Sequence, residues 1–104
     1  MPTDQLSIRS QERAQKFGER EFPQTWKDWD GIGPESAAAL RAKGISHPLH
    51  LLGHFLMISQ DPDIFDAFLK SAGVASGSVR LVRASLQEFV SMKGLALSLP
   101  RVAE

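Results

Sequence analysis

The sequence predicts an all-α fold, a compact domain of five helices. Strand signals are scarce, because β-branched residues are few and nowhere alternate with polar residues over a useful length. Apolar residues instead recur at spacings of three and four, which is typical of helices with one buried face. Proline and glycine stand where such helices begin and end.

The composition is that of an ordinary globular domain, expected at residues 1–94 and followed by a short tail at 95–104. Of the 104 residues, 42% are hydrophobic and 23% are charged. Twelve basic and twelve acidic side chains cancel, so any nucleic-acid binding must depend on a local patch. Cysteine is absent, which excludes disulfides and thiolate metal sites. The tail either frays or adds a short segment to the domain or to a partner.

The first helix is expected from Asp4 to about Lys16, on a thin apolar stripe. A single helical turn should follow, with Thr25 as its cap and Trp26 and Trp29 three residues apart. We interpret the two indoles as packing residues that cover the core and not as a platform for stacking bases.

The second helix is expected to start at Gly33, with Pro34 at its first position, and to stop at Gly44. A third helix should run from a Ser46 cap to about Ile58. Because that helix is apolar around most of its circumference, we expect it to be covered on more than one side.

Asp61 is the predicted cap of a fourth helix over residues 61–73, with Pro62 at its first position. A fifth helix should start near Ser78, after a run of small residues. Gly94 is expected to close it.

Residues 31–45 read GIGPESAAALRAKGI, a tight turn before an alanine-rich helix. Glycine lets the backbone turn sharply and approach a ligand closely. The N–H groups of Ile32, Gly33 and the first helical turn can then face a phosphate oxygen, and the helix dipole adds to the attraction. Alternatively, Gly31 and Gly33 only make a tight corner between helices. We favour a helix-hairpin-helix around residues 25–45, because the match extends over the whole unit.

From Gly31 onward the sequence resembles the barrier-to-autointegration factor family, small all-helical chromatin proteins with a SAM-like fold. The resemblance is carried by GIGPESAAALRAKGI, by LLGHFLMISQDPDIFDAFLK and by the Arg80-containing helix that ends in SLQEF, and it covers about residues 31–89. It implies a homodimer that binds double-stranded DNA without sequence preference and bridges two duplexes.

Carried over by position, the resemblance implies two sets of residues. The nucleic-acid-binding set is Gly31, Ile32, Gly33, Glu35, Ser36, Lys43, Ala75, Ser76, Gly77 and Arg80. The dimer-interface set is Leu52, Gly53, Leu56, Met57 and Ile64. In the animal proteins a groove across the dimer also holds LEM-domain partners, which implies a protein partner here.

The hairpin helix departs from the family pattern, because it carries Glu35 and alanines where the family has lysines. Each lost phosphate partner lowers affinity and flattens its salt dependence. Four basic residues nonetheless fall on the elements predicted to carry the site, namely Arg41, Lys43, Arg80 and Arg83. Acidic residues gather at 61–66, so the chain could keep a small positive face; ordinary solvated charges are the alternative interpretation.

His47, His50 and His54 lie at helical spacing, close enough for one helix face to bind a metal. No carboxylate is adjacent in sequence to complete such a site, so we expect surface or interface histidines and neither a metal nor a cofactor. No serine lies in a recognisable catalytic setting. We therefore expect no enzymatic activity.

The leading hypothesis is a dimeric DNA-binding and DNA-bridging protein. Its rival is a protein-interaction adaptor on the same dimeric scaffold with weak or no DNA binding. A third interpretation, an isolated hairpin domain of the kind found in DNA-repair or competence proteins, predicts a monomer. No signal peptide or membrane span is expected, so the protein should be intracellular, in the nucleus on chromatin or in a bacterial nucleoid or cytoplasm.

Overall fold

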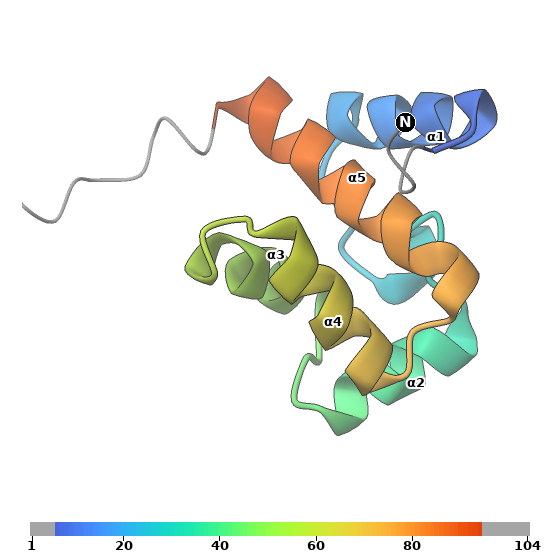
Figure 1. The fold of residues 1–104 in the computed structure, drawn as a ribbon, viewed down its shortest axis with the longest axis vertical. Coiled ribbons are helices and arrows are strands. Elements are labelled where there is room, and N and C mark those ends of the chain that lie inside the picture. Colours follow the sequence, from blue (N-terminus) through green and yellow to red (C-terminus); the bar gives the residue numbers. More distant parts are fainter. Residues whose placement is uncertain (1–5, 95–104) are drawn as a thin grey trace, which may run out of the picture.

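The computed structural model describes residues 6–94, which form five α-helices and one turn of 3-10 helix. The elements are α1 (Ile8–Glu19), η1 (Trp26–Asp28), α2 (Pro34–Ala42), α3 (Pro48–Met57), α4 (Pro62–Ala72) and α5 (Ser76–Lys93). The predicted all-α fold is confirmed, and residues 6–94 contain no strand. In Figure 1 the long helix α5 runs through the middle of the molecule, with α1 on one side and α2, α3 and α4 on the other.

The predicted start of the first helix at Asp4 is wrong. Helix α1 begins at Ile8, because Ser7 has an extended backbone and its hydroxyl accepts a hydrogen bond from the Ser10 amide at 3.2 Å. The helix also continues past Lys16 to Glu19. Asp4 itself lies outside the described residues.

Proline and glycine mark the helix ends where they were expected to. Gly33 precedes Pro34 at the start of α2, and Gly44 follows that helix with a φ of +88°. The Asp61 carboxylate caps α4 and accepts from the amides of Asp63 and Ile64 at 2.9 and 3.0 Å.

Two predicted helix starts are wrong by one or two residues. His47, not Ser46, precedes the first turn of α3, because Pro48 takes the first helical position and forces an extended residue before it. Helix α5 begins at Ser76, two residues before the predicted Ser78, with Ala75 ahead of it. Its predicted end at Gly94, with a φ of +68°, is confirmed.

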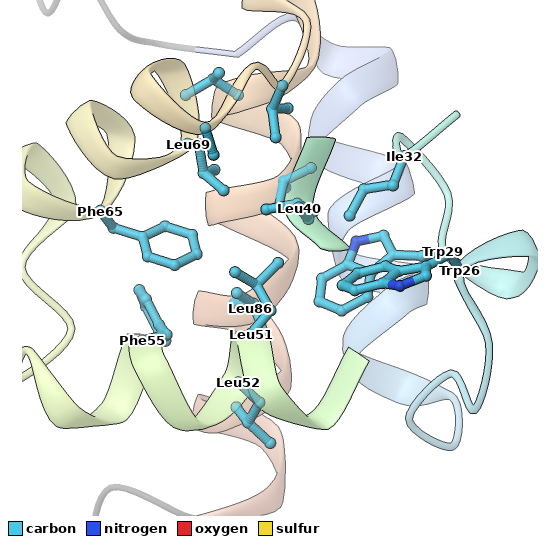
Figure 2. Packing of buried hydrophobic residues seen from close by; sticks show 14 of the residues in the cluster. Trp26, Trp29, Ile32, Leu40, Leu51, Leu52, Phe55, Phe65, Leu69 and Leu86 are labelled. Atoms are coloured by element: carbon cyan, nitrogen blue, oxygen red, sulfur yellow. The ribbon is translucent and has the colours of Figure 1, made fainter. Parts of the chain in front are cut away.

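The hydrophobic core lies where α3, α4, α2 and α5 meet, and η1 closes it (Figure 2). Phe55 of α3 and Phe65 of α4 are fully buried, with ring centroids 4.9 Å apart. Trp26 and Trp29 are also buried, and the Trp26 indole N–H donates to the Ser46 carbonyl at 3.1 Å. The prediction that both tryptophans are packing residues is confirmed.

Helix α1 is bound to the rest of the molecule through an aromatic cluster and a close helix crossing. Phe17 lies against Trp29 with ring centroids 4.9 Å apart, and Phe22 lies against Phe89 at the same separation. A Cβ on Gly18 would come within 2.9 Å of the Glu88 backbone, so α1 and α5 cross closely only because residue 18 is glycine. Helix α1 is therefore anchored on α5.

Candidate nucleic-acid interface

A tight turn over Trp29–Ile32 leads into α2. The Ile32 amide donates to the Trp29 carbonyl at 3.2 Å, and Gly31 has a φ of +106°. A Cβ on residue 31 would also lie 3.1 Å from Cδ2 of Leu81 in α5. The backbone conformation therefore favours glycine at position 31, and the Leu81 contact adds to the cost of any side chain, which supports the tight-corner interpretation for this residue.

Gly33 is different, because nothing in the fold requires glycine there. Its φ of −82° and ψ of 178° suit any residue, and no atom lies within 4 Å of the position that a Cβ would take. The missing side chain instead leaves the backbone of the first turn of α2 open. Within residues 6–94 the N–H groups of Gly33, Glu35 and Ser36 have no hydrogen-bond partner.

Two of the predicted backbone donors are already engaged. The Ile32 amide closes the turn, and the Ile32 side chain is buried. The Ala75 amide donates to the Ser36 hydroxyl at 3.2 Å. These two residues therefore shape the interface and do not offer the N–H groups that the sequence suggested.

The Ser36–Ala75 hydrogen bond joins the first turn of α2 to the residue before α5, although the two are 39 residues apart in sequence. Ser36 is only 6% exposed, so its hydroxyl is a structural link. Ser76 and Gly77, next along the chain, are exposed, and their N–H groups have no partner among the described residues. The positive ends of two helix dipoles are thus held together. We call Gly33, Glu35, Ser36, Ser76 and Gly77 the hairpin surface.

Each half of the hairpin surface has basic residues beside it. A hollow of about 360 Å³ next to Gly33 is lined by an apolar wall from η1 and α2 and by Lys27 and Arg41. A second hollow of about 480 Å³ beside Ser76 and Gly77 is lined by Lys70 and Arg80 among others. Lys27 was not among the residues predicted from the sequence. Its position in the predicted helical turn before the hairpin could have indicated it.

Other predicted cations do not lie at this surface. Lys43 follows the last turn of α2, about 13 Å along the helix from Pro34 at 1.5 Å per residue, and so lies at the opposite end from the unpaired amides. Arg83 was expected on a positive face, which is wrong, because its side chain is buried against Asp66 with Nε 2.9 Å from Oδ1. A carboxylate one turn into α4 draws that guanidinium inward.

Comparison with known protein families assigns the chain. The family model described as barrier to autointegration factor matches residues 9–93, most of the chain. The protein belongs to the barrier-to-autointegration factor family. The match confirms the resemblance seen from Gly31 onward and extends it back into α1. The family is one of DNA-binding proteins that are not enzymes. No curated protein and no solved structure matches the chain significantly.

In this member of the barrier-to-autointegration factor family, a second exposed surface lies on α3 and α4. Leu49 and Met57 are 64% and 75% exposed, and Ile64 is 53% exposed. Leu56 is half-buried, and no atom lies within 4 Å of where a Cβ of Gly53 would stand. We call Leu49, Gly53, Leu56, Met57 and Ile64 the apolar surface.

The expectation that the third helix is covered on more than one side does not hold within the described chain. Leu51, Leu52 and Phe55 face the core, whereas the opposite side of α3 is exposed. Leu52, a predicted interface residue, therefore belongs to the core of its own chain (Figure 2).

His47 precedes α3, whereas His50 and His54 lie within it, and the three side chains make different contacts. The His50 Nδ1 accepts from the Ser46 amide at 3.2 Å, and the His54 ring lies on Phe68 with centroids 4.1 Å apart. His47 packs edge-on against His50 at 5.2 Å. Over residues 6–94, no three histidine, cysteine, aspartate or glutamate side chains are grouped so as to hold a metal ion. None of the described helices is long and apolar enough to cross a bilayer.

Proposed function

We propose that this member of the barrier-to-autointegration factor family binds double-stranded DNA without sequence preference through the hairpin surface. The observation that carries the proposal is Gly33, a glycine whose Cβ position is open and which adjoins amides without hydrogen-bond partners among residues 6–94. A backbone N–H and a helix dipole attract a phosphate oxygen equally well on every DNA sequence. Contacts of this kind hold a duplex without reading its bases.

The surrounding charges support a modest affinity. Lys27 and Arg41 flank one half of the hairpin surface, and Lys70 and Arg80 flank the other. If each cation neutralises one phosphate, the logarithm of the binding constant falls against the logarithm of salt concentration with a slope of about −3 to −4. The zero net charge of the chain adds no long-range attraction.

The apolar surface supports the second part of the proposal, a homodimer that bridges two duplexes. Exposed methionine, leucine and isoleucine side chains around an exposed glycine are the composition of an interface core. With two copies joined through this surface, the dimer carries two hairpin surfaces. A protein partner in a groove across that dimer, on the pattern of the animal proteins, is part of the same proposal.

The test is the anisotropy of short labelled duplexes of unrelated sequence, titrated with the wild-type protein and with Gly33→Glu. A glutamate side chain fits at position 33 without a clash, so the variant should fold. The added carboxylate then lies close to the amides that are proposed to bind phosphate. We expect equal affinities for all wild-type duplexes and a loss of about tenfold or more in the variant, because one added charge and one blocked contact act together. Wild-type binding that Gly33→Glu leaves unchanged would contradict the hairpin assignment.

The matched control is Ser91→Glu. Ser91 is exposed on the last turns of α5, about 22 Å along that helix from Ser76 at 1.5 Å per residue. The Ser91→Glu variant carries the same added charge far from the hairpin surface, so its affinity for DNA should stay close to that of the wild type. A glutamate at Gly31 is unsuitable as a test, because the φ of +106° and the Leu81 contact would disturb the fold.

The zero net charge favours one alternative, a dimeric protein-interaction adaptor on the same scaffold. That function predicts a stable dimer with no DNA binding even at low salt. A monomer that binds DNA would instead indicate an isolated hairpin domain. Sedimentation equilibrium combined with the anisotropy titration separates the three outcomes.

A further inference from the structure

An acidic residue, Asp30, lies in the turn that leads into the proposed phosphate-binding surface. It directly precedes Gly31. Its Cα is at most about 11 Å from that of Gly33, because each residue spans at most 3.8 Å. Fixed charges act over about 10 Å at 0.1 M salt, so an unpaired Asp30 carboxylate would repel a phosphate at the hairpin surface.

Arg13 of α1 forms a two-pronged ion pair with this carboxylate. Its Nε lies 2.8 Å from Oδ2 of Asp30, and its Nη2 contacts Oδ1. The planar guanidinium matches the carboxylate in this arrangement, which fixes both side chains. The hydrogen bond from Arg13 lowers the pKa of Asp30 below its usual value, and the nearby Arg20 charge adds to the effect, although partial burial opposes it.

The pair is held in place from the α1 side. Phe17, one turn after Arg13, packs on Trp29, the residue before Asp30. Helix α1 is therefore fixed against the same turn that carries the carboxylate. Both charged side chains remain about 40% exposed, at 42% and 41%, so the pair contributes little to folding stability.

We propose that Arg13 is a positioning residue for DNA binding, which masks the Asp30 carboxylate and so makes the hairpin turn acceptable to a phosphate backbone. The inference rests on the proposed function. It assigns α1 a part in binding that does not require Arg13 to touch DNA. The proposal also explains how the turn can carry Asp30 although it must approach a DNA phosphate.

Two single variants test the proposal by the sign of their effects. Arg13→Gln exposes the Asp30 charge, and we expect DNA affinity at low salt to fall about three- to tenfold. Asp30→Asn removes the acid and keeps an acceptor for Arg13, and affinity should stay unchanged or rise about threefold. If the pair served only to hold the turn, Arg13→Gln would lose the two-pronged contact and Asp30→Asn would lose one of its two prongs, so both variants would bind less well. Such parallel losses would overturn the proposal.

Three further variants separate local masking from net charge and from geometry. Lys16→Gln removes another exposed cation of α1, and its effect should stay below about twofold because no acid of the turn is left unpaired. Arg13→Lys keeps the masking charge without the two-pronged contact, and it should bind within about threefold of the wild type. The double variant of Arg13→Gln with Asp30→Asn should return to wild-type affinity within about twofold. An Arg13→Gln effect no larger than that of Lys16→Gln would overturn the proposal.

The same titration distinguishes failure of this inference from failure of the proposed function. If the wild type binds duplexes and Gly33→Glu does not, the hairpin surface is correct and the Arg13 and Asp30 variants judge the masking role alone. If the wild type does not bind at all, the proposed function fails first and the masking role fails with it. Thermal unfolding of each variant shows whether the fold is retained.

Discussion

The hairpin surface and the apolar surface each contain a glycine that the fold does not need, yet the two surfaces suit different ligands. Neither Gly33 nor Gly53 has any atom within 4 Å of where a Cβ would stand. Gly33 precedes a helix, next to amides without partners among the described residues, whereas Gly53 lies inside α3 beside exposed apolar side chains. The first arrangement attracts an anion, and the second favours another apolar protein surface.

The comparison shows that a glycine is informative only together with its neighbours. In the interior of α3, glycine costs about 1 kcal/mol relative to alanine, so Gly53 reduces the stability of its own helix. At the start of α2, Gly33 costs little, because glycine is among the residues accepted before a helix. On the proposed function, close approach of a partner accounts for both glycines, whereas the helix end accounts for Gly33 alone.

Placing a charge on the apolar surface should have the largest effect. Met57→Glu would bury a carboxylate without a partner if two copies meet through this surface, and we expect the dimer to weaken by about 3 kcal/mol. Sedimentation equilibrium measures the loss, and Ile8→Glu is the control, because Ile8 is 74% exposed against 75% for Met57. The monomeric variant should still bind one duplex but lose bridging. An unchanged dimer would assign the interface to another face.

The two glycines of the hairpin provide the next test. Gly31→Ala should lower the free energy of unfolding by about 1–3 kcal/mol, because a Cβ at a φ of +106° is strained and would press on Leu81. Gly33→Ser should not lower it by more than about 0.5 kcal/mol, because the position is open, the backbone is ordinary and serine is accepted before a helix at least as well as glycine. Urea unfolding compares the two. Equal losses would mean that Gly33 also serves the fold, which removes the main support for the hairpin surface.

The link between the two halves of the hairpin surface should matter for both stability and binding. Ser36→Ala leaves the Ala75 amide without its acceptor, and we expect a loss of about 1 kcal/mol in unfolding free energy and several-fold weaker DNA binding. The control is Ser85→Ala, because Ser85 is buried and its hydroxyl has no partner within the described residues. Ser85→Ala should leave the free energy of unfolding unchanged or raise it. A Ser36→Ala protein that binds DNA normally would show that the two halves act independently.

The smallest expected effect is the loss of the stability contributed by the Arg13–Asp30 pair as the pH is lowered. The pKa of Asp30 is lowered in the folded protein, mainly by the hydrogen bond from Arg13. The contribution of the pair to stability is therefore complete above about pH 4, the pKa in the unfolded chain, and is lost as pH falls through the lower folded value. Exposure limits it to at most about 1 kcal/mol. Thermal unfolding of wild type and Asp30→Asn should differ more at pH 6 than at pH 3; a constant difference would contradict this.

Helix ends marked by proline or glycine were predictable, because those residues restrict the backbone locally. Pro34, Pro62 and Gly94 each stand where the structure uses them. The start of α5 was missed by two residues, because the run of small residues before it offers serines as caps, whereas the structure places Ala75 ahead of the first turn with no side-chain cap. Local sequence signals thus predicted most helix boundaries. They failed where no proline, glycine or side-chain cap marks the start of the helix.

The candidate site was predictable to the extent that it depends on local geometry. The hairpin pattern predicted open amides in the first turn of α2, and those of Gly33 and Glu35 have no hydrogen-bond partner among residues 6–94. It could not locate the burial of Arg83 on Asp66, which are 17 residues apart and meet only when α4 packs on α5. The Arg13–Asp30 pair has the same separation and depends on how α1 lies across the turn. Long-range ion pairs of this kind follow from the tertiary fold and not from spacing.

The Ser36–Ala75 hydrogen bond has a consequence for protein synthesis. Because its two residues are 39 positions apart, the halves of the hairpin surface meet only after the chain from α2 to the start of α5 has folded. A nascent chain that has left the ribosome only as far as α3 offers one helix end to a phosphate instead of two. On the proposed function, affinity for DNA should therefore develop late, and incomplete or partly unfolded chains should compete poorly for sites on the duplex.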